Sequence, residues 1–91
     1  MAYMLTRIHV DDYDAWKPMF DSDPPNVRTN ARGHRVFRGL DDPNEVFVQV
    51  EFASPDEARA AREKLVASGV LERVTVTSPP TLALDAETVV H

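Results

Sequence analysis

Alternating apolar and polar positions indicate four strands along the chain. The clearest covers residues 45–52, where valines alternate with mostly polar residues. Residues 3–10, 33–40 and 70–77 are also rich in β-branched and aromatic side chains. A period of two is typical of a strand that buries one face. We therefore predict four strands, and we expect the proline pair at 79–80 to end the last of them.

A helix is predicted between the first two strands, after an aspartate pair that can cap it. Its aromatic residues recur at helical spacing and share one face: Tyr13, Trp16 and Phe20. Pro18 lies inside this pattern, and a proline ring clashes with the carbonyl group four residues earlier. We therefore expect a kinked helix or one that begins near Trp16. The Asp-Pro-Pro-Asn segment at 23–26 is expected to end it.

A second helix is predicted after the third strand. Residues 54–57 read Ser-Pro-Asp-Glu, which is a capping box with proline at the first helical position. Gly69 can adopt the left-handed conformation that ends a helix. The positions expected to be buried are Ala58, Ala61, Leu65 and Val66.

The resulting order, β-α-β-β-α-β, predicts an α+β ferredoxin-like fold with both helices on one face of an antiparallel sheet. The other face would expose apolar side chains such as Phe37 or Phe47, and pairing with a second copy would bury them. At 91 residues and 10.2 kDa the chain has the size of one domain, residues 1–91. Residues 81–91 are expected to form a tail or a short edge strand.

Composition removes several classes of function. The chain has no cysteine, which excludes disulfides, thiolate metal sites and a cysteine nucleophile. Its net charge of -5 disfavours nucleic-acid binding. Only three glycines are present and no phosphate loop is visible, so no nucleotide cofactor is expected. No long apolar run suggests a membrane span or a signal peptide, and we expect a cytoplasmic protein.

Two histidines are the candidate catalytic residues. His9 and His34 lie on strands that we expect to be adjacent, and histidine is the usual general base near neutral pH. If both faced the helices, one could remove a proton and the other stabilise an oxyanion. The alternative is a hydrogen-bonded role in the sheet or in an interface. A metal site of His9, His34 and Glu51 lacks a supporting spacing motif, so no metal is predicted.

The aromatic helix face is the candidate substrate-binding surface. Tyr13, Trp16 and Phe20 could stack against a planar substrate, or they could simply pack the helix on the sheet. Four arginines also fall close together in sequence: Arg28, Arg32, Arg35 and Arg38. We take Arg35 as the candidate anchor for an anionic substrate. The alternative is that these arginines pair with the plentiful acidic side chains.

Three segments carry a resemblance to a known family over about residues 3–80. They are Tyr-Asp-Ala-Trp-Lys-Pro-Met-Phe-Asp at 13–21, Gly-His-Arg-Val-Phe-Arg at 33–38 and Asp-Pro-Asn-Glu-Val at 42–46. With the order of elements, they make the chain resemble the dimeric α/β barrel superfamily, particularly antibiotic biosynthesis monooxygenases and related polyketide cyclases. The resemblance implies a homodimer with a pocket between sheet and helices in each subunit. It also implies that a helix tryptophan, here Trp16, belongs to that pocket.

Two functions follow as hypotheses. The first is a cofactor-independent monooxygenase or cyclase that acts on a small aromatic or polyketide-like molecule between the first helix and the sheet. His9 or His34 would serve as its base. The second is a non-catalytic dimer of the same fold that binds a small ligand or a protein partner.

Overall fold

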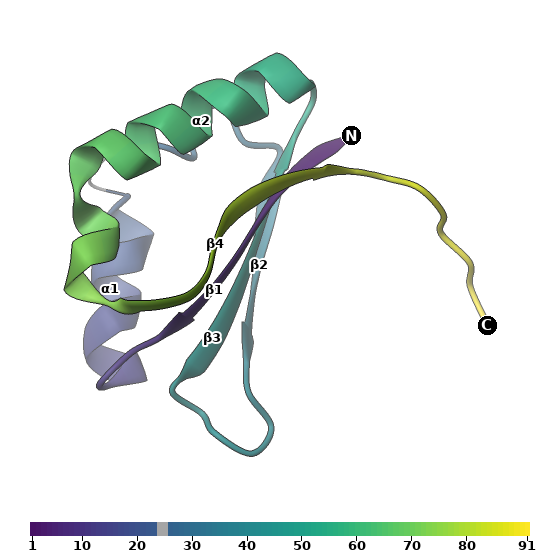
Figure 1. The fold of residues 1–91 in the computed structure, drawn as a ribbon. Helices are drawn as coiled ribbons and strands as arrows, with labels where there is room; N and C mark the ends of the chain where they lie inside the picture. The colour runs from purple at the N-terminus through teal and green to yellow at the C-terminus, as the bar shows by residue number, and fades with distance from the viewer. Residues whose placement is uncertain (24–25) are drawn as a thin grey trace.

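The computed structural model describes residues 1–23 and 26–91 of the chain, so the prolines at 24–25, expected to end the first helix, lie outside it. Figure 1 shows one sheet with two helices beside it. The elements in chain order are β1 (Ala2–His9), α1 (Tyr13–Ser22), β2 (Gly33–Arg38), β3 (Glu45–Phe52), α2 (Pro55–Ser68), the 3-10 helix η1 (Val70–Arg73) and β4 (Thr75–Leu84). The predicted β-α-β-β-α-β order is confirmed.

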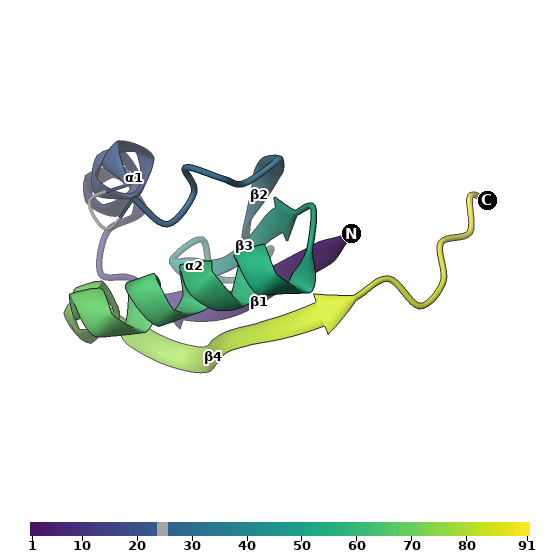
Figure 2. The ribbon, with the colours of Figure 1, turned by 90° about the horizontal axis from the view of Figure 1, so that it is seen from above.

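The sheet is antiparallel throughout, with the strand order β2-β3-β1-β4. Both helices cover the same side of it, as Figure 2 shows from above. We call this side the helix face; it carries Met4, Thr6 and Ile8 of β1, paired with Val50, Val48 and Val46 of β3. The opposite side, which we call the open face, carries Leu5, Arg7 and His9 of β1 with Gln49, Phe47 and Glu45 of β3.

The core lies between the helix face and the helices, in two neighbouring clusters. One cluster is centred on Phe52 and packs the two buried alanines of α2 against β1 and β3. The other packs Trp16 of α1 against Ile8 and Val46. Phe52 and Val46 are completely buried. The fold therefore buries the valine side of β3, as its alternating pattern predicts.

The open face retains exposed apolar side chains. Leu5 is 41% exposed, Phe37 45% and Phe47 36%. No described helix covers this side of the sheet, as Figure 2 shows. The prediction of an uncovered apolar face is confirmed.

Helix α1 begins at Tyr13, earlier than the start near Trp16 that was one of the two predicted alternatives. The Asp12 carboxylate accepts a hydrogen bond from the amide of Asp14 at 3.0 Å and caps a helix that starts at Tyr13. The helix continues through Pro18, so a start near Trp16 is wrong. Burial of the aromatic face offsets the hydrogen bond that the proline cannot donate.

Helix α2 follows the predicted signals at both ends. The Ser54 hydroxyl accepts from the Glu57 amide at 3.2 Å, and Gly69 ends the helix with a φ of 74°. Ala58 and Ala61 are buried as predicted, whereas Val66 is 60% exposed. Val66 lies outside the apolar stripe because each residue advances by roughly 100° around the axis. Among the described residues, no helix is long and apolar enough to cross a membrane.

The last strand differs most from its prediction. Residues 70–73 form η1, the strand begins at Thr75, and it passes through the proline pair at 79–80 to Leu84. The pairing with β1 shifts register near these prolines. Because β4 is an edge strand, prolines that cannot donate to a ladder are tolerated there. Residues 81–84 thus form edge strand, and residues 85–91 extend away from the sheet (Figure 1).

Candidate functional site

A cavity of about 90 Å³ lies between α1, the helix face and the segment that joins α2 to β4. Its lining is mostly apolar and includes Ile8, Val48 and Leu71. The polar residues in the lining are Thr6, Asp23 and Arg28. We call this space the helix-face cavity. It is smaller than an engineered cavity of about 150 Å³ that accepts benzene, so as it stands it holds a compact apolar group.

Two of the three predicted aromatic residues line this cavity. Trp16 and Phe20 stack with their ring centroids 4.9 Å apart and their planes at 30°. Trp16 is 8% exposed, and its indole N–H donates to no other described residue. The ring centroid of Tyr13 lies 5.8 Å from that of Trp16, but Tyr13 is outside the lining. The guanidinium of Arg38 lies 3.9 Å from the centroid of the Tyr13 ring. The aromatic surface that a ligand in the cavity would meet is therefore the pair Trp16 and Phe20.

The two candidate catalytic histidines do not meet. The strand β3 lies between β1 and β2, so the expectation that His9 and His34 occupy adjacent strands is wrong. His34 pairs with Val50 and therefore belongs to the helix face, whereas His9 belongs to the open face. His34 is exposed and contacts the edge of the Phe20 ring, with centroids 5.5 Å apart. Neither histidine lines the cavity.

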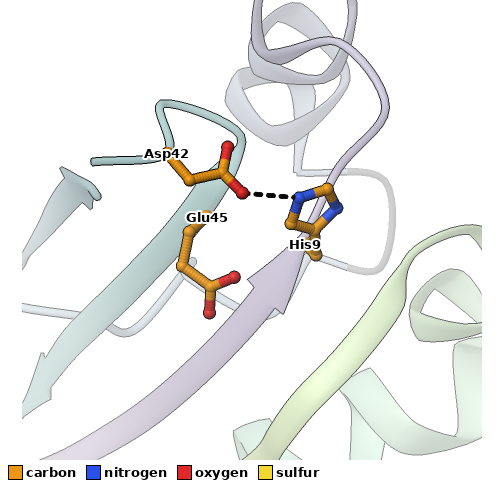
Figure 3. A group of neighbouring side chains, drawn as sticks. All are labelled: His9, Asp42 and Glu45. Atoms are coloured by element: carbon orange, nitrogen blue, oxygen red, sulfur yellow. Dashed lines mark hydrogen bonds and ion pairs between the residues drawn. The ribbon is translucent and has the colours of Figure 1, made fainter. Parts of the chain in front are cut away.

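His9 joins a polar group at the end of the open face, drawn in Figure 3. Its Nε2 lies 2.9 Å from Oδ2 of Asp42, in the turn between β2 and β3. One candidate ligand atom from each of His9, Asp42 and Glu45 lies within 4.8 Å of the others. Glu45 is also paired with Arg7. Sequence analysis missed this group because Asp42 is 33 residues from His9 along the chain.

The carboxylate of Asp42 is held in its ionised form. Its Oδ1 accepts a hydrogen bond from the Asn44 amide at 3.0 Å, and its Oδ2 contacts His9. The Asn44 amide first, and then His9, lower the pKa of Asp42 below its ordinary value of 3.8. Asp42 thus closes the β2–β3 turn and positions the imidazole of His9. Imidazole and carboxylate are also donors that transition metals accept, although each of these groups already has a protein partner.

Arg35, the predicted anion anchor, lies away from the cavity. It pairs with Gln49 on the open face and is exposed. Strand alternation therefore carries its side chain to the side opposite Trp16. The prediction that Arg35 could serve a ligand between α1 and the sheet is wrong.

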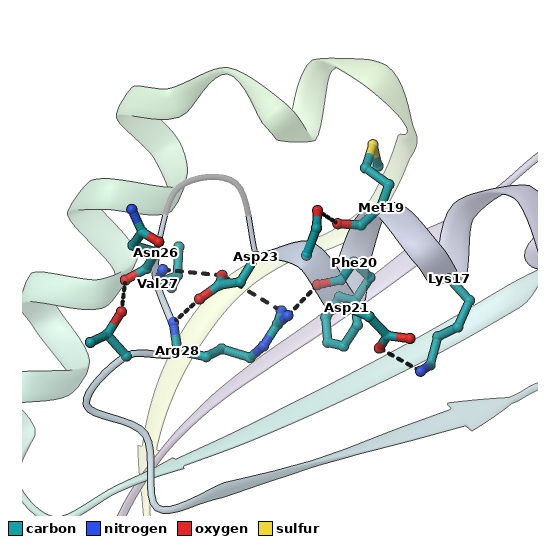
Figure 4. Close-up of polar contacts among 10 residues, drawn as sticks. Lys17, Met19, Phe20, Asp21, Asp23, Asn26, Val27 and Arg28 are labelled. Carbon is teal, nitrogen blue, oxygen red and sulfur yellow. Dashed lines mark hydrogen bonds and ion pairs between the residues drawn. The ribbon is translucent and has the colours of Figure 1, made fainter.

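Arg28 occupies the position that Arg35 was expected to fill. Its side chain is 14% exposed, and its guanidinium lies 3.7 Å from the centroid of the Phe20 ring. One of its terminal nitrogens donates to the carbonyl oxygen of Phe20, at the end of α1 (Figure 4). Burial lowers the pKa of Arg28, while the nearby carboxylates of Asp23 and Asp21 act against that shift. Arg28 is one of the four arginines that cluster in the sequence, but no sequence pattern distinguished it from the other three.

Asp23 holds the loop that carries Arg28. It has a left-handed φ of 46°, and its two carboxylate oxygens accept from the amides of Val27 and Arg28 at 3.1 and 2.9 Å. Figure 4 shows these bonds together with the Arg28 contact to Phe20. Aspartate tolerates this backbone conformation better than most residues. The backbone at Val27 and Arg28 is therefore fixed near the end of α1, and this fixes the origin of the Arg28 side chain.

Comparison with known proteins shows the fold. No family model and no curated protein sequence matches this chain. Among solved structures, a mutant of SnoaB, a cofactor-independent oxygenase from Streptomyces nogalater, matches 96% of this chain and 94% of its own, with a TM-score of 0.70 and 17% identity. Rv0793 from Mycobacterium tuberculosis has the same coverages, a TM-score of 0.61 and 15% identity. This chain shares the ferredoxin-like fold of both proteins. The predicted α+β ferredoxin-like fold class is confirmed.

Proposed function

We propose that this protein is a homodimeric α/β barrel that takes a small aromatic molecule into the helix-face cavity and oxygenates or cyclises it without a cofactor. The observation that carries the proposal is the cavity itself, lined by the stacked Trp16 and Phe20. The likeness to SnoaB, described as a cofactor-independent oxygenase, supports the type of reaction. Fold alone sets an expectation for chemistry, and the cavity supplies the local argument.

The oxygenation needs no electron donor besides the substrate. On a phenol, a ring C–H becomes a carbonyl as the phenol becomes a quinone: one atom of O2 enters the substrate, and the other leaves as water with that ring hydrogen and the hydroxyl hydrogen. The protein would bind the ring against Trp16, orient it and exclude water from it. The small cavity favours a single ring over a fused polycyclic system.

The homodimer is proposed from the open face. Leu5, Phe37 and Phe47 expose apolar surface that a second copy, related by a two-fold axis, would cover. Light scattering on a sizing column tests this part, because the dimer has a mass of about twice 10.2 kDa. A single domain spanning residues 1–91 and a cytoplasmic location stay predictions.

A non-catalytic ligand-binding dimer is the second candidate, and one observation favours it. Both candidate histidines lie outside the cavity lining, and among the described residues the only carboxylate in the lining, that of Asp23, accepts hydrogen bonds from two backbone amides. A proton acceptor for the chemical step would then have to come from the substrate or from solvent. This arrangement suits binding at least as well as catalysis.

Oxygen consumption separates the two candidates. Wild-type protein is incubated with a panel of monocyclic phenols and keto acids, while dissolved oxygen is recorded and products are identified by mass. We expect turnover that Trp16→Leu abolishes and that Leu40→Ala, a change at a fully exposed side chain, leaves intact. Saturable binding without oxygen uptake or any rearranged product would establish the non-catalytic alternative.

A further inference from the structure

Arg28 brings a positive charge to a mostly apolar cavity. Its side chain is 14% exposed, and its guanidinium lies on the face of Phe20, one of the two aromatic residues of the lining. Long charged side chains usually extend their charged ends into water. Here the charged end is instead held beside the space that a ligand would enter.

The neighbouring carboxylate of Asp23 does not hydrogen-bond to this guanidinium. Asp23 directs its two oxygens to the backbone amides of Val27 and Arg28, and the closest guanidinium nitrogen, Nη1, is 3.9 Å from Oδ1. That separation is longer than a hydrogen bond. The contact of the guanidinium with the Phe20 carbonyl uses one of its N–H donors. Among the described residues, every fully buried side-chain nitrogen has a hydrogen-bond partner. The remaining N–H groups of the Arg28 guanidinium are therefore reached by solvent and available to a ligand.

We propose that the ligand of the helix-face cavity is a small monocarboxylate, whose carboxylate binds Arg28 and whose compact apolar body lies against Trp16. This inference rests on the proposed function, since it takes the cavity as the ligand site. A guanidinium matches the planar geometry of a carboxylate and can bind it through two parallel hydrogen bonds. The volume of about 90 Å³ limits the enclosed body to a short branched chain or part of one ring.

The charge of the whole protein gives a carboxylate no general attraction, so its binding depends on a local cation. The chain has a net charge of -5, so its general field repels anions and does not concentrate them. Selectivity for an anion must then come from a local group. Arg28 is the only cation in the cavity lining among the described residues.

The test compares an anion with a neutral molecule of nearly the same shape. Dissociation constants of benzoate and benzamide, and of 3-methylbutanoate and 3-methylbutanamide, are measured by NMR titration against wild type, Arg28→Gln, Arg28→Lys and Arg35→Gln. We expect each acid to bind wild type more tightly than its amide. Arg28→Gln should weaken acid binding about tenfold or more and leave amide binding nearly unchanged, because charged hydrogen bonds are the stronger ones. The affinity of Arg28→Lys for each acid should lie between those of wild type and Arg28→Gln.

Arg35→Gln is the matched control, because it removes the same charge from the open face and should change neither affinity. Equal binding of acid and amide by wild type overturns the inference, as does equal weakening of both by Arg28→Gln, which would indicate a packing role. If Arg28→Gln does not fold, the wild-type comparison and Arg28→Lys still decide.

Thr6→Ile, which narrows the cavity, should weaken acid and amide alike. Wild type could bind the amide as tightly as the acid, while Thr6→Ile weakens amide binding. That result would contradict the carboxylate inference and still support the proposed cavity. Failure of all four molecules to bind would overturn both.

Discussion

Arg7 and Phe47 are direct partners across the β1–β3 ladder, and the guanidinium of Arg7 lies 5.0 Å from the centroid of the Phe47 ring. The same guanidinium pairs with the carboxylate of Glu45. The open face therefore presents an aromatic ring beside a charge pair. A cation over a ring and a partly desolvated ion pair both become stronger when water is removed, so a face of this kind suits association with a partner surface.

We predict that Phe37→Asp converts the dimer into a monomer. The substitution places a charge beside Phe47 in a surface that the partner would desolvate, where an unpaired charge is costly. Light scattering should report about twice 10.2 kDa for wild type and a single chain for the variant. Val66→Asp, at an exposed position on α2, is the control and should remain dimeric. A monomeric wild type at tens of micromolar would contradict the proposed assembly.

We predict that Gly39→Ala destabilises the protein while Gly33→Ala does not. A Cβ atom at Gly39 would lie 2.5 Å from the carbonyl oxygen of Asp42, so the β2–β3 turn would have to shift. Nothing lies within 4 Å of a Cβ at Gly33. Urea unfolding at one fixed protein concentration should show a loss of about 1–3 kcal/mol for Gly39→Ala. For Gly33→Ala the change should stay within about 0.5 kcal/mol. Equal effects would mean that the turn tolerates a side chain.

We predict that the pKa of Asp42 lies below 3.8 in the folded protein and rises in His9→Gln. The Asn44 amide is the larger cause of the lowered pKa and persists in the variant, so the rise should be partial. A carboxyl group whose pKa is lowered by folding stabilises the folded state above its unfolded pKa, near about pH 4. That contribution disappears as the pH falls through the folded pKa. Side-chain carbon NMR of Asp42 over a range of about pH 2 to 6 measures the shift. An identical titration in both proteins would exclude the His9 contribution.

We predict that Trp16→Ala lowers the free energy of unfolding by about 3–5 kcal/mol, as large aromatic truncations in cores do. Trp16 is 8% exposed and packs against Phe20 and Ile8, so its removal joins a new void to the helix-face cavity. Leu40→Ala, at a fully exposed leucine, should change stability by less than about 0.5 kcal/mol. Urea unfolding of both variants at the same concentration provides the measurement. A small effect of Trp16→Ala would mean that the cluster closes around the lost ring.

Local sequence signals predicted most of the elements. The alternating segment 45–52 forms β3 with the predicted bounds, and the signals at Ser54 and Gly69 mark the two ends of α2. These signals act through contacts within a few residues, so the sequence contains them directly. The proline pair at 79–80 misled the prediction, because whether a strand tolerates proline depends on its position in the sheet.

The site depended on information that local patterns do not carry. His9 and His34 each lie on a predicted strand, but the order of strands and the register place them on opposite faces. Arg28 belongs to a loop, where neither helical nor strand periodicity says which way a side chain points. Trp16 and Phe20 could be predicted because their helical spacing fixes a common face.

The prolines of β4 also bear on how copies of this chain can associate. An edge strand normally offers a row of unpaired backbone N–H groups on which a further strand can add, and this is how sheets grow into aggregates. The prolines at 79–80 have no N–H group, so the outer edge of β4 lacks a donor at this point, next to a shift in register. The edge therefore resists continuous extension along this side. This edge thus leaves the open face as the surface for the proposed closed pair.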